Sequence, residues 1–163
     1  MRTFQWMAGA VSAILIGAAP VAASATTLVK VELWDKGAGM AMPSDQIYGT
    51  PGVDSSKASM GVKLSRASAP AGVVMFVVTN SSKVMQHEMI VMALADAAKP
   101  LPYIDADARV DEDKAGDKGE VSELETGKTG TLSVTLAPGK YLLICNVPNH
   151  FAAGMWTTFT VTK

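Results

Sequence analysis

Short runs of alternating apolar and polar residues, separated by glycine and proline, limit the folds open to this chain more than any other feature. LVKVELW at 28–34 and GTLSVTL at 130–136 alternate with a period of two, and no stretch after residue 25 keeps a helical period. Such alternation is typical of strands with one buried face. Further strand-like runs lie at 60–65, 72–80, 87–94, 141–145 and 157–162. Together they predict an all-β fold, a β-sandwich or barrel.

Three segments refine this prediction. GVVMFVVTN at 72–80 has little polar interruption, which predicts a strand buried on both faces. Residues 35–57 are rich in Gly, Pro, Ser and Asp and predict a long loop. Residues 105–125 hold nine acidic residues against three basic ones, a local net charge of −6. We expect this acidic segment to be a solvated excursion with a short helix.

The first 25 residues have the organisation of a secretory signal peptide. Arg2 precedes an apolar stretch, and Ala23-Ser24-Ala25 forms a small-residue cleavage site. The alternative is a membrane anchor, but the apolar stretch is shorter than the roughly 20 residues that span a bilayer. Cleavage after Ala25 would leave a single domain at 26–163, exported to the periplasm with no membrane anchor.

The charge of this predicted mature chain excludes some partners. Without Arg2 it has 13 basic and 15 acidic residues, a net charge of −2. Nothing in that balance indicates binding to nucleic acid or to an anionic membrane surface. We expect a monomer.

The single cysteine, Cys145, is the residue that most needs an explanation. One cysteine cannot form an internal disulfide, and a free thiol in an oxidising compartment is exposed to oxidation. It could be a small buried hydrophobe or a metal ligand. In CNVPNHFAAGM, His150 and Met155 follow Cys145 at steps of five residues. The other histidine of the chain, His87, opens a strand-like run, where it could be structural or could meet this loop at one end of a sandwich.

The residue types of this set select the metal. Thiolate and thioether disfavour Ca²⁺ and Mg²⁺, and structural zinc sites seldom use a thioether. Two histidines and a cysteine with a weak axial methionine form type 1 copper sites. The set predicts one copper ion, Cu(I) or Cu(II), per chain. Met40 and Met42, in a glycine-rich stretch, are candidates for an accessory copper contact.

These motifs resemble the cupredoxins, the small blue or green copper proteins. The likeness lies in VMQHEM at 84–89 and in LAPGKYLLIC followed by CNVPNHFAAGM at 136–155. The Cys-x4-His-x4-Met spacing is most like that of rusticyanin and auracyanin, within a group that includes plastocyanin and azurin. The resemblance implies a Greek-key β-sandwich with His87, Cys145, His150 and Met155 as copper ligands.

One residue departs from the family pattern. Several electron-transfer members have Asn or Ser after the first histidine ligand, where it ties the two ligand segments together, whereas this chain has Glu88. Glu88 either accepts hydrogen bonds from loop amides near the metal or points outward from the strand.

The ligand set limits the function to two classes. Four ligands leave no open position for a substrate, and both histidines are used, so we expect no enzyme activity. The first class is an electron carrier between periplasmic redox partners, such as a cytochrome or a copper enzyme. The second class is a copper-binding protein for tolerance, storage or delivery. For docking, we expect a small apolar patch of Pro148, Phe151, Ala152 and Ala153 around His150.

Overall fold

The computed structural model describes residues 25–40, 58–96 and 99–163. The predicted signal peptide lies, apart from Ala25, outside the described residues and stays a prediction, as does the single domain at 26–163. Met42 and most of the predicted loop at 35–57 are also outside them. Within the described part of the chain, no helix has the length and apolar character needed to cross a membrane.

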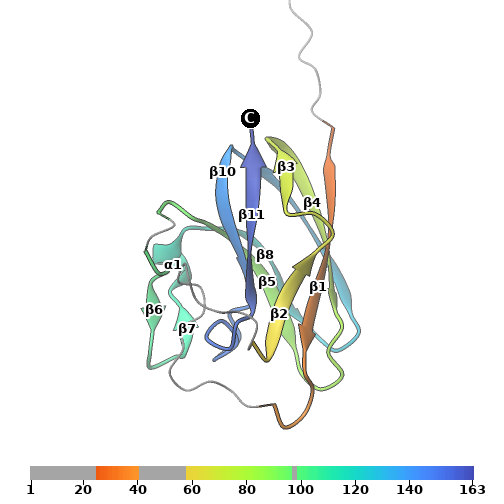
Figure 1. Ribbon diagram of the computed structural model, residues 1–163, viewed down its shortest axis with the longest axis vertical. Helices are drawn as coiled ribbons and strands as arrows, with labels where there is room; N and C mark the ends of the chain where they lie inside the picture. Colours follow the sequence, from red (N-terminus) through yellow and green to blue (C-terminus); the bar gives the residue numbers. More distant parts are fainter. Residues whose placement is uncertain (1–24, 41–57, 97–98) are drawn as a thin grey trace, which may run out of the picture.

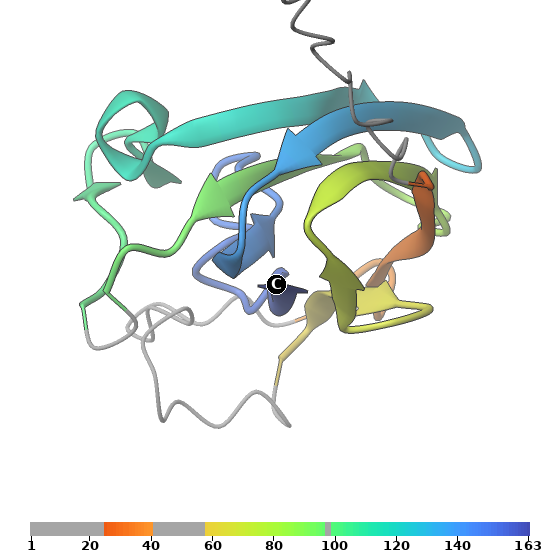
Figure 2. The ribbon, with the colours of Figure 1, turned by 90° about the horizontal axis from the view of Figure 1, so that it is seen from above.

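Two packed sheets form the body of the molecule (Figures 1 and 2). The first has the order β2-β1-β4-β9 and consists of β1 (Thr27–Asp35), β2 (Met60–Leu64), β4 (Gly72–Asn80) and β9 (Thr129–Leu136). The second has the order β3-β11-β10-β5-β8 and consists of β3 (Ser68–Pro70), β5 (His87–Ala93), β8 (Asp117–Leu124), β10 (Gly139–Ile144) and β11 (Trp156–Thr162). The all-β sandwich predicted from the sequence is confirmed.

A smaller unit lies beside the second sheet, at the left of Figure 1. It contains β6 (Tyr103–Ile104), β7 (Arg109–Val110) and the short helix α1 (Glu112–Ala115). Asp111 caps the helix by accepting a hydrogen bond from the Lys114 N–H, and Gly116 ends it in the left-handed conformation at φ 78°. We call residues 101–116 the excursion.

The main core lies between the two sheets. Alternate residues of β1 face inward, in a pattern of buried and exposed positions that follows the predicted period of two. Phe76 of β4 meets Phe159 of β11 edge to face, with ring centroids 5.5 Å apart. Cys145 and Met155 belong to the same buried cluster, so the candidate ligand loop is anchored in the core.

A second apolar cluster covers the outer face of β5 and β10. Leu101, Val110 and Ala115 of the excursion pack there, together with Phe151. As a result β5 is the strand buried on both faces: its residues from His87 to Met92 are all buried. The expectation that 72–80 is buried on both faces is wrong, because β4 alternates and Met75 is 36% exposed.

The acidic segment at 105–125 also differs from its prediction. The expected short helix is present as α1, but residues 117–124 form β8 rather than a solvated loop. This strand pairs antiparallel with β5, and His87 lies opposite Leu124. The acidic residues of β8, Asp117, Glu120 and Glu123, are exposed while Val121 is buried. Their charge made this edge strand resemble a solvated segment in the sequence.

Candidate metal centre

His87 is positioned by the turn that precedes β5. Asn80, the last residue of β4, donates through Nδ2 to the carbonyl oxygens of Met85 at 3.0 Å and Leu124 at 2.8 Å. Its Oδ1 accepts the N–H of Ser82 at 2.9 Å. Because Asn80 is fully buried, these bonds fix the turn in which the chain reverses. His87 therefore begins β5 at the end of the sandwich where β1 and β10 finish.

Cys145 and His150 lie in the loop between β10 and β11, the ligand loop (145–155). The Cys145 N–H donates to the Met155 carbonyl at 2.9 Å, and the Met155 N–H donates to the His150 carbonyl at 3.0 Å. These bonds fold the loop back so that His150 faces Cys145. Gly154 has φ 101°, and a Cβ there would lie 2.6 Å from the Ala58 Cβ, so a larger residue would displace the loop.

Three donor atoms converge at this end of the sandwich. The two Nδ1 atoms of His87 and His150 are 3.2 Å apart, and the Cys145 Sγ is 3.4 Å from the His150 Nδ1. One donor from each of the three residues lies within 4.8 Å of the other two. His87 and Cys145 are fully buried and His150 is 7% exposed. Residues separated by up to 63 positions thus meet around one point, as the sequence predicted.

Met155 lies beside this group. Its side chain is fully buried in the same cluster as Cys145, and its backbone is tied to both Cys145 and His150. Its thioether could therefore supply a further sulfur donor, and its role as a ligand stays a prediction. Met40 packs, partly buried, against the same core.

Asp35 is a site residue that sequence reasoning missed. The last residue of β1, it places its Oδ2 2.9 Å from the His87 Nε2, and its side chain is only 1% exposed. Its Oδ1 accepts the Gly37 N–H at 2.7 Å. An Asp-x-Gly turn after an alternating strand is a visible sequence signal. Nothing in the sequence, however, indicates that its carboxylate reaches a histidine 52 residues away.

Glu88 accepts a hydrogen bond from a loop amide, which is the first of the two roles that the sequence left open. Its carboxylate Oε1 accepts the Asn146 N–H at 3.0 Å, and its own N–H donates to the Cys145 Sγ at 3.4 Å. Glu88 is only 7% exposed, so it does not point into solvent. It ties β5 to the ligand loop as Asn or Ser is expected to do in the related pattern. The role of Glu88 is thus to join the strand that carries His87 to the loop that carries Cys145.

The ligand loop is also joined to the excursion. Asn146 Oδ1 accepts the Val110 N–H at 2.7 Å, and its Nδ2 donates to the Val110 carbonyl at 2.9 Å and to Glu112 Oε1 at 2.7 Å. The Asn149 N–H adds a bond to the Ala108 carbonyl at 2.8 Å. The loop that carries Cys145 and His150 is therefore held from outside the sandwich as well as from inside.

Burial disfavours charge on Cys145, His150 and Glu88. Burial raises the pKa of the Cys145 thiol to about 12, against the Glu88 and Val147 amides, which lower it. Burial, reinforced by His87, lowers the pKa of His150 to about 4. Burial also raises the pKa of Glu88 to about 7. Metal binding deprotonates a coordinating thiol, so it must release a proton from this site.

The pKa values of Asp35 and His87 reflect their contact. Burial disfavours the Asp35 carboxylate, but hydrogen bonds from Ser82, His87 and Gly37 outweigh it and hold its pKa below the usual value. Burial lowers the pKa of His87, although Asp35 opposes this shift. An ionised carboxylate thus faces a neutral imidazole.

The expected apolar docking patch is smaller than the sequence indicated. Phe151 and Ala153 are buried, at 1% and 0% exposure, because they pack into the two cores. Pro148 is exposed and Ala152 is half-buried beside His150. The prediction of a four-residue patch is wrong for the two buried residues.

Residues 55–163, more than half of the chain, match the family model described as the sulfocyanin (SoxE) domain. The chain belongs to this family. The match includes His87, Cys145, His150 and Met155, and it confirms the predicted membership of the cupredoxins. No curated protein matches the chain.

Solved structures show a similar fold at low sequence identity. Auracyanin from Roseiflexus castenholzii is 21% identical, with 86% of this chain and 99% of that chain covered and a TM-score of 0.50. Auracyanin B is 22% identical, with 91% and 94% covered and a TM-score of 0.52. Rusticyanin from Thiobacillus ferrooxidans is 19% identical, with 83% and 77% covered and a TM-score of 0.52. These likenesses establish the fold.

Copper is the cofactor of this sulfocyanin-family chain, one ion per chain. The donor atoms of the structure fit it: two imidazole nitrogens and a thiol sulfur converge in a buried site. This soft, nitrogen- and sulfur-rich set suits copper rather than an oxygen-seeking cation.

Proposed function

We propose that this protein is an exported carrier of single electrons, with copper held by His87, Cys145, His150 and Met155. The observation that carries the proposal is the convergence of the two Nδ1 atoms and the Cys145 Sγ in a buried, preformed cluster. Bound copper supplies the one-electron couple between Cu(II) and Cu(I). With both histidines of the chain in this cluster, a second histidine-rich copper centre has no ligands left.

The surrounding residues hold the donors in one arrangement. The Glu88 N–H donates to the Cys145 sulfur and so stabilises its thiolate form. The Glu88 carboxylate fixes the Asn146 amide, which immediately follows Cys145. The turn held by Asn80 fixes the start of β5 at His87. Because these groups are buried and hydrogen-bonded, the donor residues would rearrange little when the oxidation state of the copper changes.

Electron exchange would occur at the His150 edge. His150 is the member of the converging triad that retains some solvent exposure, 7% against 0% for His87 and Cys145, and the neighbouring Pro148 and Ala152 of the loop are exposed and half-buried. Redox partners dock over small interfaces, for which this limited apolar area is adequate. The partner would be a periplasmic redox protein, such as a cytochrome or a copper enzyme.

A Cu(II) titration followed by visible absorption and EPR tests the proposal. We expect one equivalent of copper to give an intense thiolate-to-copper band and an unusual EPR splitting. Cys145→Ser should abolish the band while far-UV circular dichroism shows an intact sandwich, and Ser133→Ala, at an exposed position of β9, should retain the band as a control. A colourless protein, binding of several copper ions, or binding of Cu(I) alone would overturn the electron-carrier proposal in favour of copper storage or delivery.

A further inference from the structure

The Asp35 carboxylate is buried and lies against the His87 imidazole. Its side chain is 1% exposed and that of His87 is 0% exposed, with 2.9 Å between Oδ2 and Nε2. The three lysine–carboxylate ion pairs of the described residues differ, because they join exposed lysines to Glu32, Asp96 and Asp111. A buried charge is costly unless it is bonded, so this carboxylate requires an explanation beyond solubility.

The contact sets which nitrogen of His87 carries the hydrogen. An ionised carboxylate can only accept a hydrogen bond, so the Nε2 atom of His87 must be the protonated one. The lone pair of the neutral ring then lies on Nδ1. That atom is 3.2 Å from the His150 Nδ1 in the donor cluster. Asp35 thus prepares His87 as a ligand through Nδ1 before any metal enters.

Asp35 is itself held in place. The Gly37 N–H donates to Oδ1 at 2.7 Å, and the Ser82 side chain also bonds to the carboxylate. Ser82 belongs to the turn that Asn80 fixes. The carboxylate is therefore supported from both β1 and the turn before β5, and it cannot leave His87 without breaking this network.

We infer that Asp35 is a positioning residue that fixes the tautomer of His87 and places a negative charge behind it, so that the site favours Cu(II) over Cu(I). The inference rests on the proposed function, because it assumes that His87 binds copper. A carboxylate that accepts the second N–H of a histidine ligand makes the imidazole a stronger donor. A stronger donor stabilises the more highly charged ion and lowers the reduction potential.

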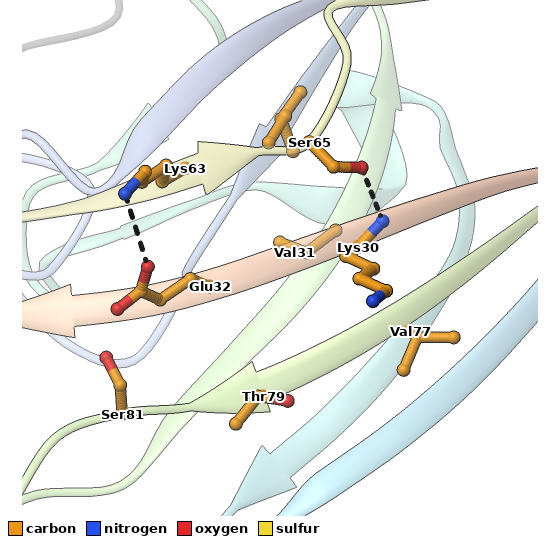
Figure 3. Close-up of a pocket in the computed structure, with 9 residues that line it drawn as sticks. Lys30, Val31, Glu32, Lys63, Ser65, Val77, Thr79 and Ser81 are labelled. Atoms are coloured by element: carbon orange, nitrogen blue, oxygen red, sulfur yellow. Dashed lines mark hydrogen bonds and ion pairs between the residues drawn. The ribbon is translucent and has the colours of Figure 1, made fainter.

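The decisive variant is Asp35→Asn, measured against Glu32→Gln. Glu32 lies on the same strand, but it is exposed and pairs with Lys63 of the neighbouring strand at 3.7 Å, in the lining of the pocket drawn in Figure 3. Both variants remove one carboxylate charge, so the control measures the effect of net charge alone. Loss of such a partner typically weakens metal affinity by about 10–100-fold.

We expect Asp35→Asn to lower the Cu(II) affinity relative to the Cu(I) affinity by at least about tenfold. Tenfold corresponds to a rise in potential of about 59 mV for a one-electron couple. The thiolate-to-copper band should remain. A potential that moves no further than in Glu32→Gln would overturn the inference, although the band would still support the copper site.

A second measurement uses the wild-type protein without copper and does not depend on whether a variant folds. Nitrogen-15 NMR of the metal-free imidazole rings distinguishes the two tautomers. We expect the His87 hydrogen on Nε2 and slow exchange of that hydrogen with water. A hydrogen on Nδ1 would overturn the inference. Absence of the thiolate-to-copper band in loaded wild-type protein would instead overturn the proposed function, whichever tautomer is found.

Discussion

Two buried asparagines, Asn80 and Asn146, make similar hydrogen bonds beside the two segments that carry the donor residues of the metal centre. Each accepts one backbone N–H and donates to two acceptors, and their exposures are 0% and 1%. Their partners differ. Asn80 joins the turn before His87 to β8 within the sandwich, whereas Asn146 joins the ligand loop to the excursion. The His87 side is therefore held by the sandwich, and the Cys145 side is also held by an addition to it.

This difference indicates which side of the site opens at the lower free-energy cost. Local opening costs less free energy where fewer buried contacts must be broken. The bonds of Asn80 lie among strands of the main core, so they should open only when the sandwich unfolds. The bonds of Asn146 depend on a short helix and two-residue strands, so the excursion side should open first.

Removing copper should have the largest effect on this comparison, because the metal joins the two sides. At free copper about 1,000 times its dissociation constant, binding adds about 4 kcal/mol to the free energy of unfolding. We expect this increase for the Cu(I) protein against the metal-free protein. Denaturant unfolding followed by far-UV circular dichroism measures it, and coincident unfolding curves would contradict a site shared by both sides.

Asn80→Ala should have the next largest effect on the free energy of unfolding, because it removes the hydrogen bonds that hold the His87 side of the site to the sandwich. It leaves the carbonyl oxygens of Met85 and Leu124 and the N–H of Ser82 without their partner. We expect a loss of about 3 kcal/mol, the upper end of the cost of an unpaired buried polar group. Thr79→Ala is the control, because its hydroxyl bonds the Thr129 hydroxyl at an exposed position. Equal stability of the two variants would refute the special role of Asn80.

Asn146→Ala should cost less and act locally. We expect about 1–2 kcal/mol, because Glu112 is half-exposed and water can replace part of the network. Hydrogen exchange should accelerate at the Val110 and Asn149 amides while β1 and β4 stay protected. The exposed substitution Asp105→Asn should leave exchange unchanged. Faster exchange throughout the sandwich would show that the two sides are not separable.

Met155→Gln should have the smallest effect on the free energy of unfolding. Its main effect should be on the reduction potential of the copper site. We expect copper to stay bound and the potential to fall, since an oxygen donor favours Cu(II), by on the order of 59 mV for a tenfold change in affinity ratio. Voltammetry measures this shift. Met92→Leu is the control, because Met92 is fully buried in the cluster on the other face of β5. An unchanged potential would argue against axial ligation by Met155.

The sequence predicted the fold and the converging triad because both depend on local patterns. Period-two alternation located β1 and β9 to within a residue or two, and the rare residues Cys145, His87 and His150 had few alternatives. Softness of the donors then selected the metal without any coordinates. These predictions needed residue types and spacing only.

The features that could not be predicted from the sequence depend on contacts between distant segments. The excursion covers β5, so burial on both faces fell on HEMIVMA rather than on the more apolar 72–80. Strand β8 was hidden because its outward acidic residues resemble a solvated segment. Asp35 meets His87 only through the sandwich, and the two asparagines have partners as far as 44 and 36 residues away.

The long sequence separations in the site have a consequence for how the protein is made. His87 lies 52 residues from Asp35 and 63 from His150, so the donor cluster exists only after distant segments of the chain have closed on one another. Chains dominated by such non-local pairings fold slowly, on the millisecond-to-second scale. The stretch from Cys145 to Met155 is local and can meet copper before that closure, but without His87. The complete donor set therefore becomes available to copper only after these distant segments have met.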